Sequence, residues 1–396
     1  MTNVVITSAA RTAIGSYGKG LKDVPPTELG RIAAEAALER SAVDGGHVDH
    51  VVFGNVIHTE TADMYMARVV GVNAGIPIET PAFTVNRLCG TGVQAIVSAA
   101  QAIQVGDAEV ALAGGAESMS RAPYWMPSAR WGSKMGSADL TDPVSGSLTD
   151  PFHDILMGST AENLAERHGI TRERQDAFAV LSHQRASAAQ ETGTFDEQIV
   201  PVPVRVKRET VPFTADEHIR HDASLEGMAA LRPVFKREGG TVTAGNASGM
   251  NDAGAAVVLM DADRAAELGA PVRARILSYA VCGVDPAYMG IGPVPAVEKA
   301  LARAGRTLDE VGVIELNEAF AAQALAVMIE LGIDDEDPKV NPNGGAIALG
   351  HPIGATGALI TAKALDEMER RDHELGLVTL CIGGGQGIAL LLGRDV

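Results

Sequence analysis

Cysteine is scarce in this chain, with three residues among 396. Three thiols cannot frame a disulfide-stapled secreted domain. There is also no CxxC or HxxxH spacing, so the sequence predicts no metal site. The N-terminus has no basic start followed by an apolar block. We therefore expect no signal peptide and a cytoplasmic location.

The chain also has few basic residues and no long apolar runs. The chain has 32 Lys and Arg against 50 Asp and Glu, a formal net charge of −18. This balance argues against nucleic acid and anionic membranes as partners. No apolar run approaches the roughly 18 residues needed to cross a bilayer. The stretch 201–240 is nearly neutral, which makes it the least unfavourable place for a phosphorylated ligand.

Glycine is abundant, with 44 residues, well above the usual share of about 7%. Two of the three cysteines lie in glycine-rich turns, Cys89 in NRLCGTG and Cys381 in CIGGGQG. His351 lies in a third such turn, GHPIGATG. Glycine lets a ligand approach the backbone closely. Two thiols and a histidine in such turns predict a thiol active site assembled from distant segments.

Strand-like and helix-like runs alternate through the first 118 residues, which predicts a layered α/β fold. We expect a helix at 28–40 capped by Thr27, a second helix at 93–105, and strands at 3–7, 51–56, 82–85 and 109–113. From about residue 250 the pattern returns: Val-Asn leads into a glycine-rich turn, a helix and a strand, as it does after residue 85. The offset of about 255 to 262 residues indicates an internal duplication.

Three regions follow from this pattern. Residues 1–118 form the N-terminal half of the core, completed by about 250–270, and residues 271–396 form the C-terminal half. Residues 119–249 hold both tryptophans, a long Gly, Ser, Pro and Asp-rich loop and a run with valine at every second position. We interpret this middle region as an inserted loop domain. A site at the junction of the two halves would draw residues from both.

Each candidate residue also has a structural interpretation. Cys89 directly precedes a predicted helix, where unpaired amides and the helix dipole would lower the pKa of its thiol. A buried, inert cysteine is an equal alternative. Cys381 ends a strand at a three-glycine turn, which fits an active-site thiol, a structural turn or, more weakly, a phosphate loop. His351 is held in a rigid turn that suits a base, although a lone histidine is more often structural. Cys282 lacks a glycine-rich setting and is interpreted as core.

At these motifs the chain resembles the thiolases. The matching segments, in order, are NRLCGTG at 86–92, NEAFA at 317–321, GHPIGATG at 350–357 and CIGGG at 381–385, with Arg11-Thr12 and GNASG at 245–249 in addition. The resemblance covers essentially the whole chain. It looks closest to bacterial acetyl-CoA acetyltransferases and to broad-chain β-ketothiolases of the type that feeds polyhydroxyalkanoate synthesis. It implies a five-layered fold of two βαβαβαββ halves with an inserted loop domain.

The resemblance implies an acyltransferase that reversibly condenses two acyl-CoA molecules to 3-ketoacyl-CoA and free CoA. Cys89 would be the nucleophile that becomes acylated, and His351 would accept its proton. Cys381 would remove the α-proton of the second acyl-CoA. His351 and a water held by Asn317 would bind one oxyanion, and the amides of Cys89 and Gly383 the other. CoA thioesters are then substrates, with no further cofactor.

The same resemblance implies a set of CoA-side and acyl-side residues: Arg220, Ser248, Leu156, Met157, Met289 and Phe320. Two positions depart from the family pattern. Leu156 stands where many biosynthetic members carry histidine, and Gly227 stands where they carry a CoA-side serine. Leu156 removes a polar group beside the thioester and adds apolar surface. We hypothesise that it improves tolerance of acyl groups longer than acetyl.

Three alternatives stay open. A degradative 3-ketoacyl-CoA thiolase would run the same reaction in the other direction. A ketoacyl synthase would share the duplicated fold but lacks the second cysteine, so Cys381 counts against it. A non-catalytic acyl-CoA binder would bury both thiols. The resemblance also implies a homo-oligomer, a dimer of dimers whose tetramer contacts come from the loop at 120–140.

Overall fold

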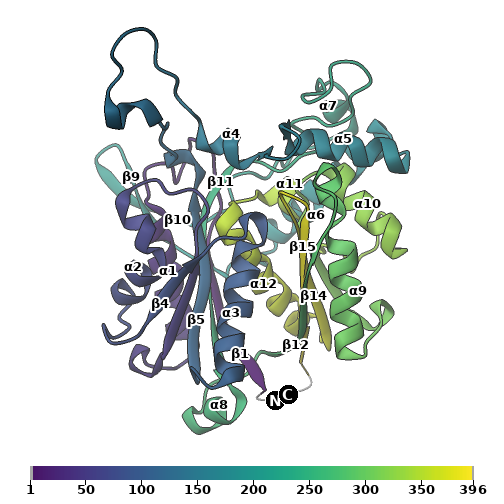
Figure 1. Ribbon diagram of the computed structural model, residues 1–396. Coiled ribbons are helices and arrows are strands. Elements are labelled where there is room, and N and C mark those ends of the chain that lie inside the picture. The colour runs from purple at the N-terminus through teal and green to yellow at the C-terminus, as the bar shows by residue number, and fades with distance from the viewer. Residues whose placement is uncertain (1–2, 395–396) are drawn as a thin grey trace.

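Two sheets with the same strand order, joined edge to edge into one continuous 11-stranded sheet, form the core of the computed structural model, which describes residues 3–394 (Figure 1). The first sheet has the order β4-β3-β5-β11-β1 and the second the order β13-β14-β15-β12. The strands of the first are β1 (Val4–Thr12), β3 (His50–Gly54), β4 (Ala82–Val85), β5 (Val110–Ser118) and β11 (Asn251–Asp261). Those of the second are β12 (Ala274–Gly283), β13 (Val313–Leu316), β14 (Leu375–Ile382) and β15 (Gln386–Gly393).

The repeated order confirms the duplication that the sequence predicted. In the second half a single bridge between Ile314 and Val340 occupies the place that β4 takes in the first half. The two sheets join where β1 pairs with β12 over two residues, and β2 (Gly15–Ser16) and β8 (Ile199–Val200) add short strands to the first half.

Helices complete five layers (Figure 1). The first sheet is covered on its outer face by α1 (Pro26–Arg40) and α2 (Met66–Asn73). The second is covered by α9 (Pro293–Ala304) and α10 (Ala321–Leu331). Between the sheets lie α3 (Thr91–Val105) and α12 (Ile353–Arg370), and α8 (Ala262–Leu268) packs against β1 and β11. Helix α1 begins at Pro26, not at a Thr27 cap as predicted, because proline is well suited to the first helical position.

Two motif glycines set the spacing of the central layer. A Cβ on Gly92 of α3 would lie 2.3 Å from the Ala358 amide nitrogen, and a Cβ on Gly357 of α12 would lie 2.3 Å from the Val93 nitrogen. The two helices therefore pack backbone against backbone near their N-terminal ends. Since Cys89 and His351 each precede one of these helices, the close packing brings the two glycine-rich turns to the same end of the molecule.

The stretch Leu88–Val105 is the one helical segment within residues 3–394 that is long and apolar enough to cross a membrane by length and composition, contrary to the sequence expectation. It contains α3, which is packed between the two sheets and against α12. Its apolar character is accounted for by this central position.

The middle region lies across the top of both halves (Figure 1). Its elements are β6 (Thr149–Asp150), β7 (Ile155–Leu156), β9 (Val202–Val206), β10 (Glu209–Phe213), α4 (Pro143–Ser147), α5 (Met157–His168), α6 (Arg172–Glu191) and α7 (Leu225–Ala229). The loop near 120–140 extends away from the body. The predicted valine-alternating strand is split at Pro201, so that β8 pairs with β1 and β9 pairs with β10.

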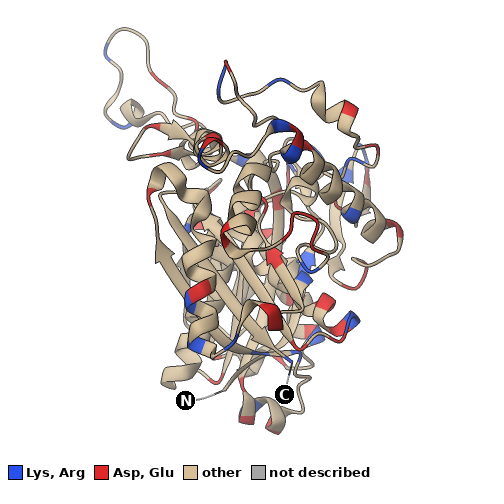
Figure 2. Cartoon of the chain, turned by 90° about the vertical axis from the view of Figure 1, so that its right-hand side faces the viewer, with Lys and Arg blue, Asp and Glu red and all other residues tan. Residues whose placement is uncertain are grey.

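Charged residues lie mainly on the outer helices and loops, and the central layers carry few (Figure 2). Two of the exceptions are buried ion pairs. Arg11 and Asp216 form a fully buried ion pair with a 2.8 Å contact, and Lys363 and Glu315 form another at 2.8 Å. Losing one partner of such a pair costs about 3–5 kcal/mol, because the remaining charge stays buried.

Candidate active site

Cys89 lies in a strained turn at the start of α3. It occupies a short 3₁₀ turn, Leu88–Gly90, directly before Thr91. Leu88 has φ = +45°, a left-handed conformation that costs a non-glycine residue about 1–2 kcal/mol. The turn is held by hydrogen bonds from the Arg87 amide to Thr91 Oγ1 (2.8 Å) and from the Leu88 amide to Asn86 Oδ1 (2.9 Å).

Cys381 lies at the end of β14, just before a hairpin turn. Ile382 pairs with Gln386 across that turn, and three glycines lie between them. Gly384 and Gly385 have φ of +79° and +81°, values that glycine adopts without steric cost. The Cys381 side chain is fully buried, in a cluster with Met157, Met289 and Ala319 that Phe320 and Leu148 pack against.

The two thiols influence each other electrostatically, although they come from opposite halves of the chain. Burial, and after it the Cys89 sulfur, raise the pKa of Cys381 well above its usual value. The backbone amides of Gly383 and Cys89 lie close enough to the Cys89 sulfur to favour its thiolate form and lower the pKa of the thiol. A pair of amides at one sulfur is the arrangement that an oxyanion produced by attack at that sulfur would use.

The predicted lowering of the Cys89 pKa is wrong. Burial raises the pKa of Cys89 to about 11, and the hydrogen bonds from the Gly383 and Cys89 amides only partly offset it. The helix N-terminus supplies the expected donors, but desolvation of the thiolate outweighs them. The thiol is therefore neutral in the resting protein, and a nucleophilic role requires a base.

The hydrogen bonds of His351 fix its tautomer and leave one ring nitrogen free. Thr356 Oγ1 donates to the Pro352 carbonyl (2.9 Å), so its one proton is used, and His351 Nδ1 must donate to Thr356 Oγ1 at 2.7 Å. The proton on Nδ1 leaves a lone pair on Nε2, which is buried and has no hydrogen-bond partner. Burial lowers the pKa of His351 to about 4, so the imidazole is neutral.

The backbone of the His351 turn is fixed by Asn251. The His351 amide donates to Asn251 Oδ1 (2.9 Å), and Asn251 Nδ2 donates to the Gly15 carbonyl (3.0 Å). A Cβ on Gly350, whose φ is +109°, would lie 2.4 Å from the Asn251 side chain. Glycine is therefore required before the histidine both by its conformation and by the close contact.

A cavity of about 240 Å³ lies beside His351, and neither Cys89 nor Cys381 is among the residues that line it. His351 and Ser248 line it, within a mainly apolar wall completed by Met119, Leu148, Val234, Phe235, Thr243, Ala244, Ala247, Gly249, Met250, Phe320 and Ile353. Leu148 and Ile353 of this wall also pack with Cys89, and Leu148 and Phe320 pack with the Cys381 cluster. The surroundings of both thiols thus form parts of one cavity wall.

Asn317 has an unsatisfied side chain. It is 1% exposed, and neither Oδ1 nor Nδ2 has a hydrogen-bond partner. Its counterpart in the duplication, Asn55, donates from Nδ2 to the Ala116 carbonyl and to Glu117, each at 3.0 Å. A buried amide with free donor and acceptor atoms is suited to holding an ordered water.

The other predicted site residues fall into three groups. Ser248 and Phe320 line the cavity, and Arg220 donates to the carbonyl of the lining residue Ala244 at 3.1 Å. Met157 and Met289 pack around Cys381. Leu156 is the exception: it is 43% exposed and belongs neither to the cavity wall nor to the Cys381 cluster.

Sequence reasoning missed several residues that shape this site. Thr356 had a usable signal, since it lies five residues after His351 in the first turn of α12. Leu148, Phe235 and Asn251 had none, because only the fold brings them to the cavity.

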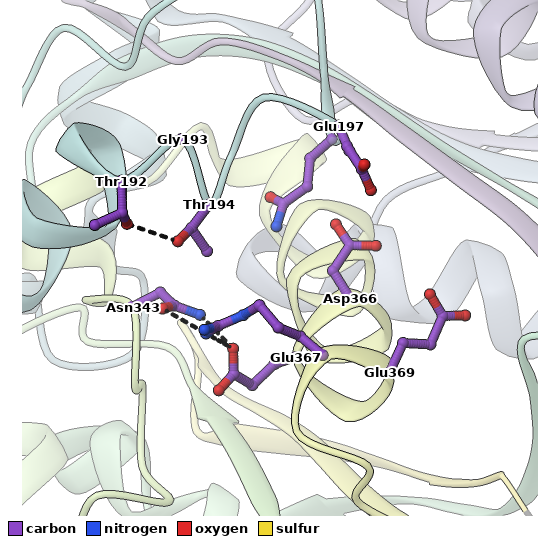
Figure 3. Close-up of a pocket in the computed structure, with 10 residues that line it drawn as sticks. Thr192, Gly193, Thr194, Glu197, Asn343, Asp366, Glu367 and Glu369 are labelled. Carbon is purple, nitrogen blue, oxygen red and sulfur yellow. Dashed lines mark hydrogen bonds and ion pairs between the residues drawn. The ribbon is translucent and has the colours of Figure 1, made fainter.

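A larger cleft, of about 710 Å³, lies elsewhere (Figure 3). It contains the C-terminal end of α12, whereas His351 precedes the N-terminal end, roughly 27 Å away for an 18-residue helix. Its acidic groups are largely paired. Asp366 and Glu369 bind Arg273, and Glu367 accepts from Asn343 at 2.8 Å. Within residues 3–394 no group of three His, Cys, Asp or Glu side chains could hold a metal ion; the absence of a cofactor stays a prediction.

The hydroxyl of Thr356 gives a testable prediction. In a Thr356→Val variant, the Nδ1–H of His351 would be buried without an acceptor, at a cost of about 1–3 kcal/mol. The tautomer with a proton on Nε2 would gain population, and we expect kcat/KM for acyl transfer to fall about 10- to 100-fold. Thr356→Ser keeps the acceptor and should stay within about threefold of the original chain. Equal rates for the two variants would show that the hydroxyl does not set the tautomer.

Comparison with known proteins identifies the family of the chain. Residues 4–263 match the thiolase N-terminal domain and residues 270–394 the thiolase C-terminal domain. The chain is 59% identical over 391 residues to beta-ketothiolase BktB of Cupriavidus necator, covering 99% of both proteins. It is 52% identical to acetyl-CoA acetyltransferase of Pseudomonas aeruginosa, covering 100% of both.

Solved structures agree as well. The crystal structure of human mitochondrial 3-ketoacyl-CoA thiolase superposes with a TM-score of 0.96 at 46% identity, covering 100% of this chain and 99% of that one. A second crystal structure of the human enzyme, in complex with CoA, gives 0.95 at 46% identity, covering 100% of this chain and 98% of that one. With both domains matched along nearly the full length, the chain belongs to the thiolase family.

Proposed function

We propose that this protein catalyses the reversible condensation of two acyl-CoA molecules to 3-ketoacyl-CoA and free CoA. The observation that carries the proposal is the free Nε2 lone pair of His351 beside a cavity whose wall shares residues with the hydrophobic clusters around Cys89 and Cys381. A covalent acyl carrier and a separate group for the α-proton are needed to join two thioesters, and two thiols can divide these tasks.

In the thiolysis direction, the reaction starts from the protonation states of the resting protein: neutral thiols on Cys89 and Cys381 and a neutral imidazole on His351. Cys89 attacks the keto carbon of 3-ketoacyl-CoA while its proton moves to His351 Nε2, because a thiol with a pKa of about 11 needs a base in contact. The carbon–carbon bond breaks, and the leaving α-carbon takes the proton of Cys381. Acetyl-CoA departs, and the remaining acyl group stays on the Cys89 sulfur.

In the second half of the reaction, Cys89, His351 and Cys381 each return to the protonation state that they had at the start. Incoming CoA passes its thiol proton to the Cys381 thiolate, and the CoA sulfur attacks acyl-Cys89. The Cys89 sulfur leaves and takes back the proton held on His351. Condensation is this sequence in reverse, with Cys381 removing the α-proton. The raised pKa of Cys381 is consistent with a thiol that holds its proton until the reaction requires it.

Two donor sets fit the two oxyanions of this scheme. The amides of Cys89 and Gly383 face the Cys89 sulfur and would bind the oxygen of the acyl-Cys89 thioester. His351 and a water held by the unpartnered amide of Asn317 would bind the oxygen of the second thioester. Arg220 and Ser248, at the rim and wall of the cavity, would contact CoA.

A non-catalytic acyl-CoA binder is the competing function, and full burial of Cys381 is the observation that favours it. Selective labelling separates the two. Iodoacetamide should modify Cys89 faster than Cys282 or Cys381, and acetyl-CoA should protect Cys89. Slow, equal labelling of all three thiols, together with no CoA release from 3-ketoacyl-CoA mixtures, would support the binder.

The preferred acyl chain and the physiological direction belong to the proposal as well. The relatives include both a beta-ketothiolase and a 3-ketoacyl-CoA thiolase, and metabolite levels decide the direction of a reversible reaction. We propose a cytoplasmic, broad-chain enzyme able to supply polyhydroxyalkanoate synthesis. Initial thiolysis rates over a series of 3-ketoacyl-CoA chain lengths would test the substrate range.

Leu156 supplies the corresponding mutational prediction. If its apolar side chain favours longer acyl groups, Leu156→His should lower the ratio of kcat/KM for a six-carbon 3-ketoacyl-CoA to that for acetoacetyl-CoA about three- to tenfold. The six-carbon substrate has two more methylenes than acetoacetyl-CoA, and burying one methylene is worth about 0.8 kcal/mol. Because Leu156 is half-exposed, we expect the change in the ratio to stay below about tenfold. An unchanged ratio would remove Leu156 as the cause.

We further propose a homo-oligomer, a dimer of dimers. The extended loop at 120–140 carries large exposed apolar side chains: Tyr124, Trp125, Met126, Trp131, Met135 and Leu140. Apolar and aromatic residues gathered on one protruding segment are typical of an interface. Light scattering should report four chains, and fewer after Trp131→Ser with Met135→Ser.

A further inference from the structure

The two amides at the Cys89 sulfur belong to different halves of the chain. One is the amide of Cys89 itself, in the turn before α3, and the other is the amide of Gly383, in the β14–β15 turn. An oxyanion pocket works only when its donors are held within about 0.5 Å of the productive geometry. A contact between the Cys89 turn and the β14–β15 turn must therefore fix their relative position.

The glycine turn has no side chains with which to hold itself. Gly383, Gly384 and Gly385 lie between the paired residues Ile382 and Gln386, so Gln386 is the first residue after the turn whose side chain can make a specific contact. A three-glycine turn is also conformationally free. The orientation of the Gly383 amide thus depends on groups outside the turn.

Arg87 makes that contact from the other half. It lies two residues before Cys89, and its Nη1 donates to Gln386 Oε1 at 2.8 Å. Its Nε donates to Gln94 Oε1 on α3 at 2.7 Å, and its backbone amide donates to Thr91 Oγ1 at 2.8 Å. The guanidinium is therefore fixed on α3 and holds the residue that closes the glycine turn. Hydrogen bonds from a charged donor are the strong, geometrically specific ones.

We infer that the Arg87–Gln386 hydrogen bond is a positioning contact that holds the Gly383 amide against the Cys89 sulfur. Neither side chain needs to touch the substrate; both act through the two turns. The inference rests on the proposed function, since it assigns the pair to the pocket for the acyl-Cys89 oxyanion. Removing a whole oxyanion donor lowers kcat about 10²- to 10³-fold, so a displaced donor should cost about 10- to 100-fold.

The test is the single-turnover rate of Cys89 acetylation by acetyl-CoA in the full-length protein. Arg87→Met and Gln386→Leu should each slow acetylation about 10- to 100-fold while the half-saturating acetyl-CoA concentration stays within about threefold. The double variant should be no slower than the slower single variant, because both remove the same contact. Gln386→Glu keeps an acceptor for the guanidinium and should retain most of the rate.

Gln101→Leu is the matched control. Gln101 Nε2, near the other end of α3, donates to Tyr279 Oη on β12 at 2.8 Å. This hydrogen bond also joins the two halves through a glutamine side chain, but it lies far from the turns at Cys89 and Cys381. The control should acetylate at the original rate, which separates loss of a cross-half bond in general from loss of this one.

Each outcome decides the inference. Original acetylation rates in Gln386→Leu, additive losses in the double variant, or a change confined to acetyl-CoA affinity would overturn it. If Arg87→Met does not fold, Gln386→Leu and Gln386→Glu carry the comparison. The original chain is measured in the same assay: if its Cys89 is not acetylated, the proposed function fails, whereas an acetylated original with unaffected variants removes only the Arg87–Gln386 role.

Discussion

Replacing Cys89 by alanine should lower kcat/KM for thiolysis of acetoacetyl-CoA by at least about 10⁴-fold, because the reaction loses the atom that carries the acyl group. The loss should not come from unfolding. Cys89 is only partly buried, and removing one partly buried sulfur costs far less than the stability of a domain. Thermal unfolding should therefore stay within a few degrees of the original chain.

Cys282→Ala provides the control for this loss. That thiol donates to the Pro295 carbonyl at 3.4 Å and packs with the hydrophobic cluster of the second half, although the Cys282 backbone pairs with Gly387, just after the Cys381 turn. Its removal should leave kcat/KM within about twofold. A Cys89→Ala protein that keeps more than about one hundredth of the original rate would exclude an acyl-Cys89 intermediate.

Replacing Cys381 by serine should separate the two halves of the reaction. Acetyl transfer between CoA and Cys89 breaks no bond to the α-carbon, and Cys381 takes part only by exchanging the proton of the CoA thiol, which water can also accept. The exchange of labelled CoA into acetyl-CoA should therefore stay within about tenfold. Thiolysis and condensation require a proton to move to or from the α-carbon. They should fall at least about 10³-fold, within the range expected for loss of a general acid or base.

The two rates are measured on the same preparation, by CoA exchange and by loss of the 3-ketoacyl-CoA absorbance. Equal loss of both rates would mean that Cys381 supports the site as a whole and does not handle the α-proton. Unchanged thiolysis would mean that another group protonates the α-carbon. Serine nearly preserves the volume of the fully buried side chain, so the packing with Met157 and Met289 should survive.

The sequence was most informative where glycine constrains the backbone. The turns around Cys89, His351 and Cys381, the duplication and the layered fold were all predicted, because tight turns and repeated strand patterns leave local signatures. Packing of Gly92 against α12 and of Gly357 against α3 then explains why the turns meet.

Properties that depend on the whole environment could not be predicted. The position of Cys89 before a helix predicted a lowered pKa for its thiol, yet burial by residues from both halves raises that pKa to about 11. The contact between Arg87 and Gln386 joins positions 299 apart in the sequence. Leu156, given a place beside the thioester by resemblance, is half-exposed. Such features are set by tertiary packing, which a sequence pattern does not encode.

The location of the acyl group tests the central claim most directly. The protein is mixed with acetyl-CoA, quenched in acid and digested, and the acetylated peptide is identified by mass spectrometry. We predict one acetyl group per chain, on Cys89, present in the Cys381→Ser variant and absent from the Cys89→Ala variant. Acetyl found on Cys381 or Cys282, or on no thiol while CoA is still released from substrate, would contradict the account.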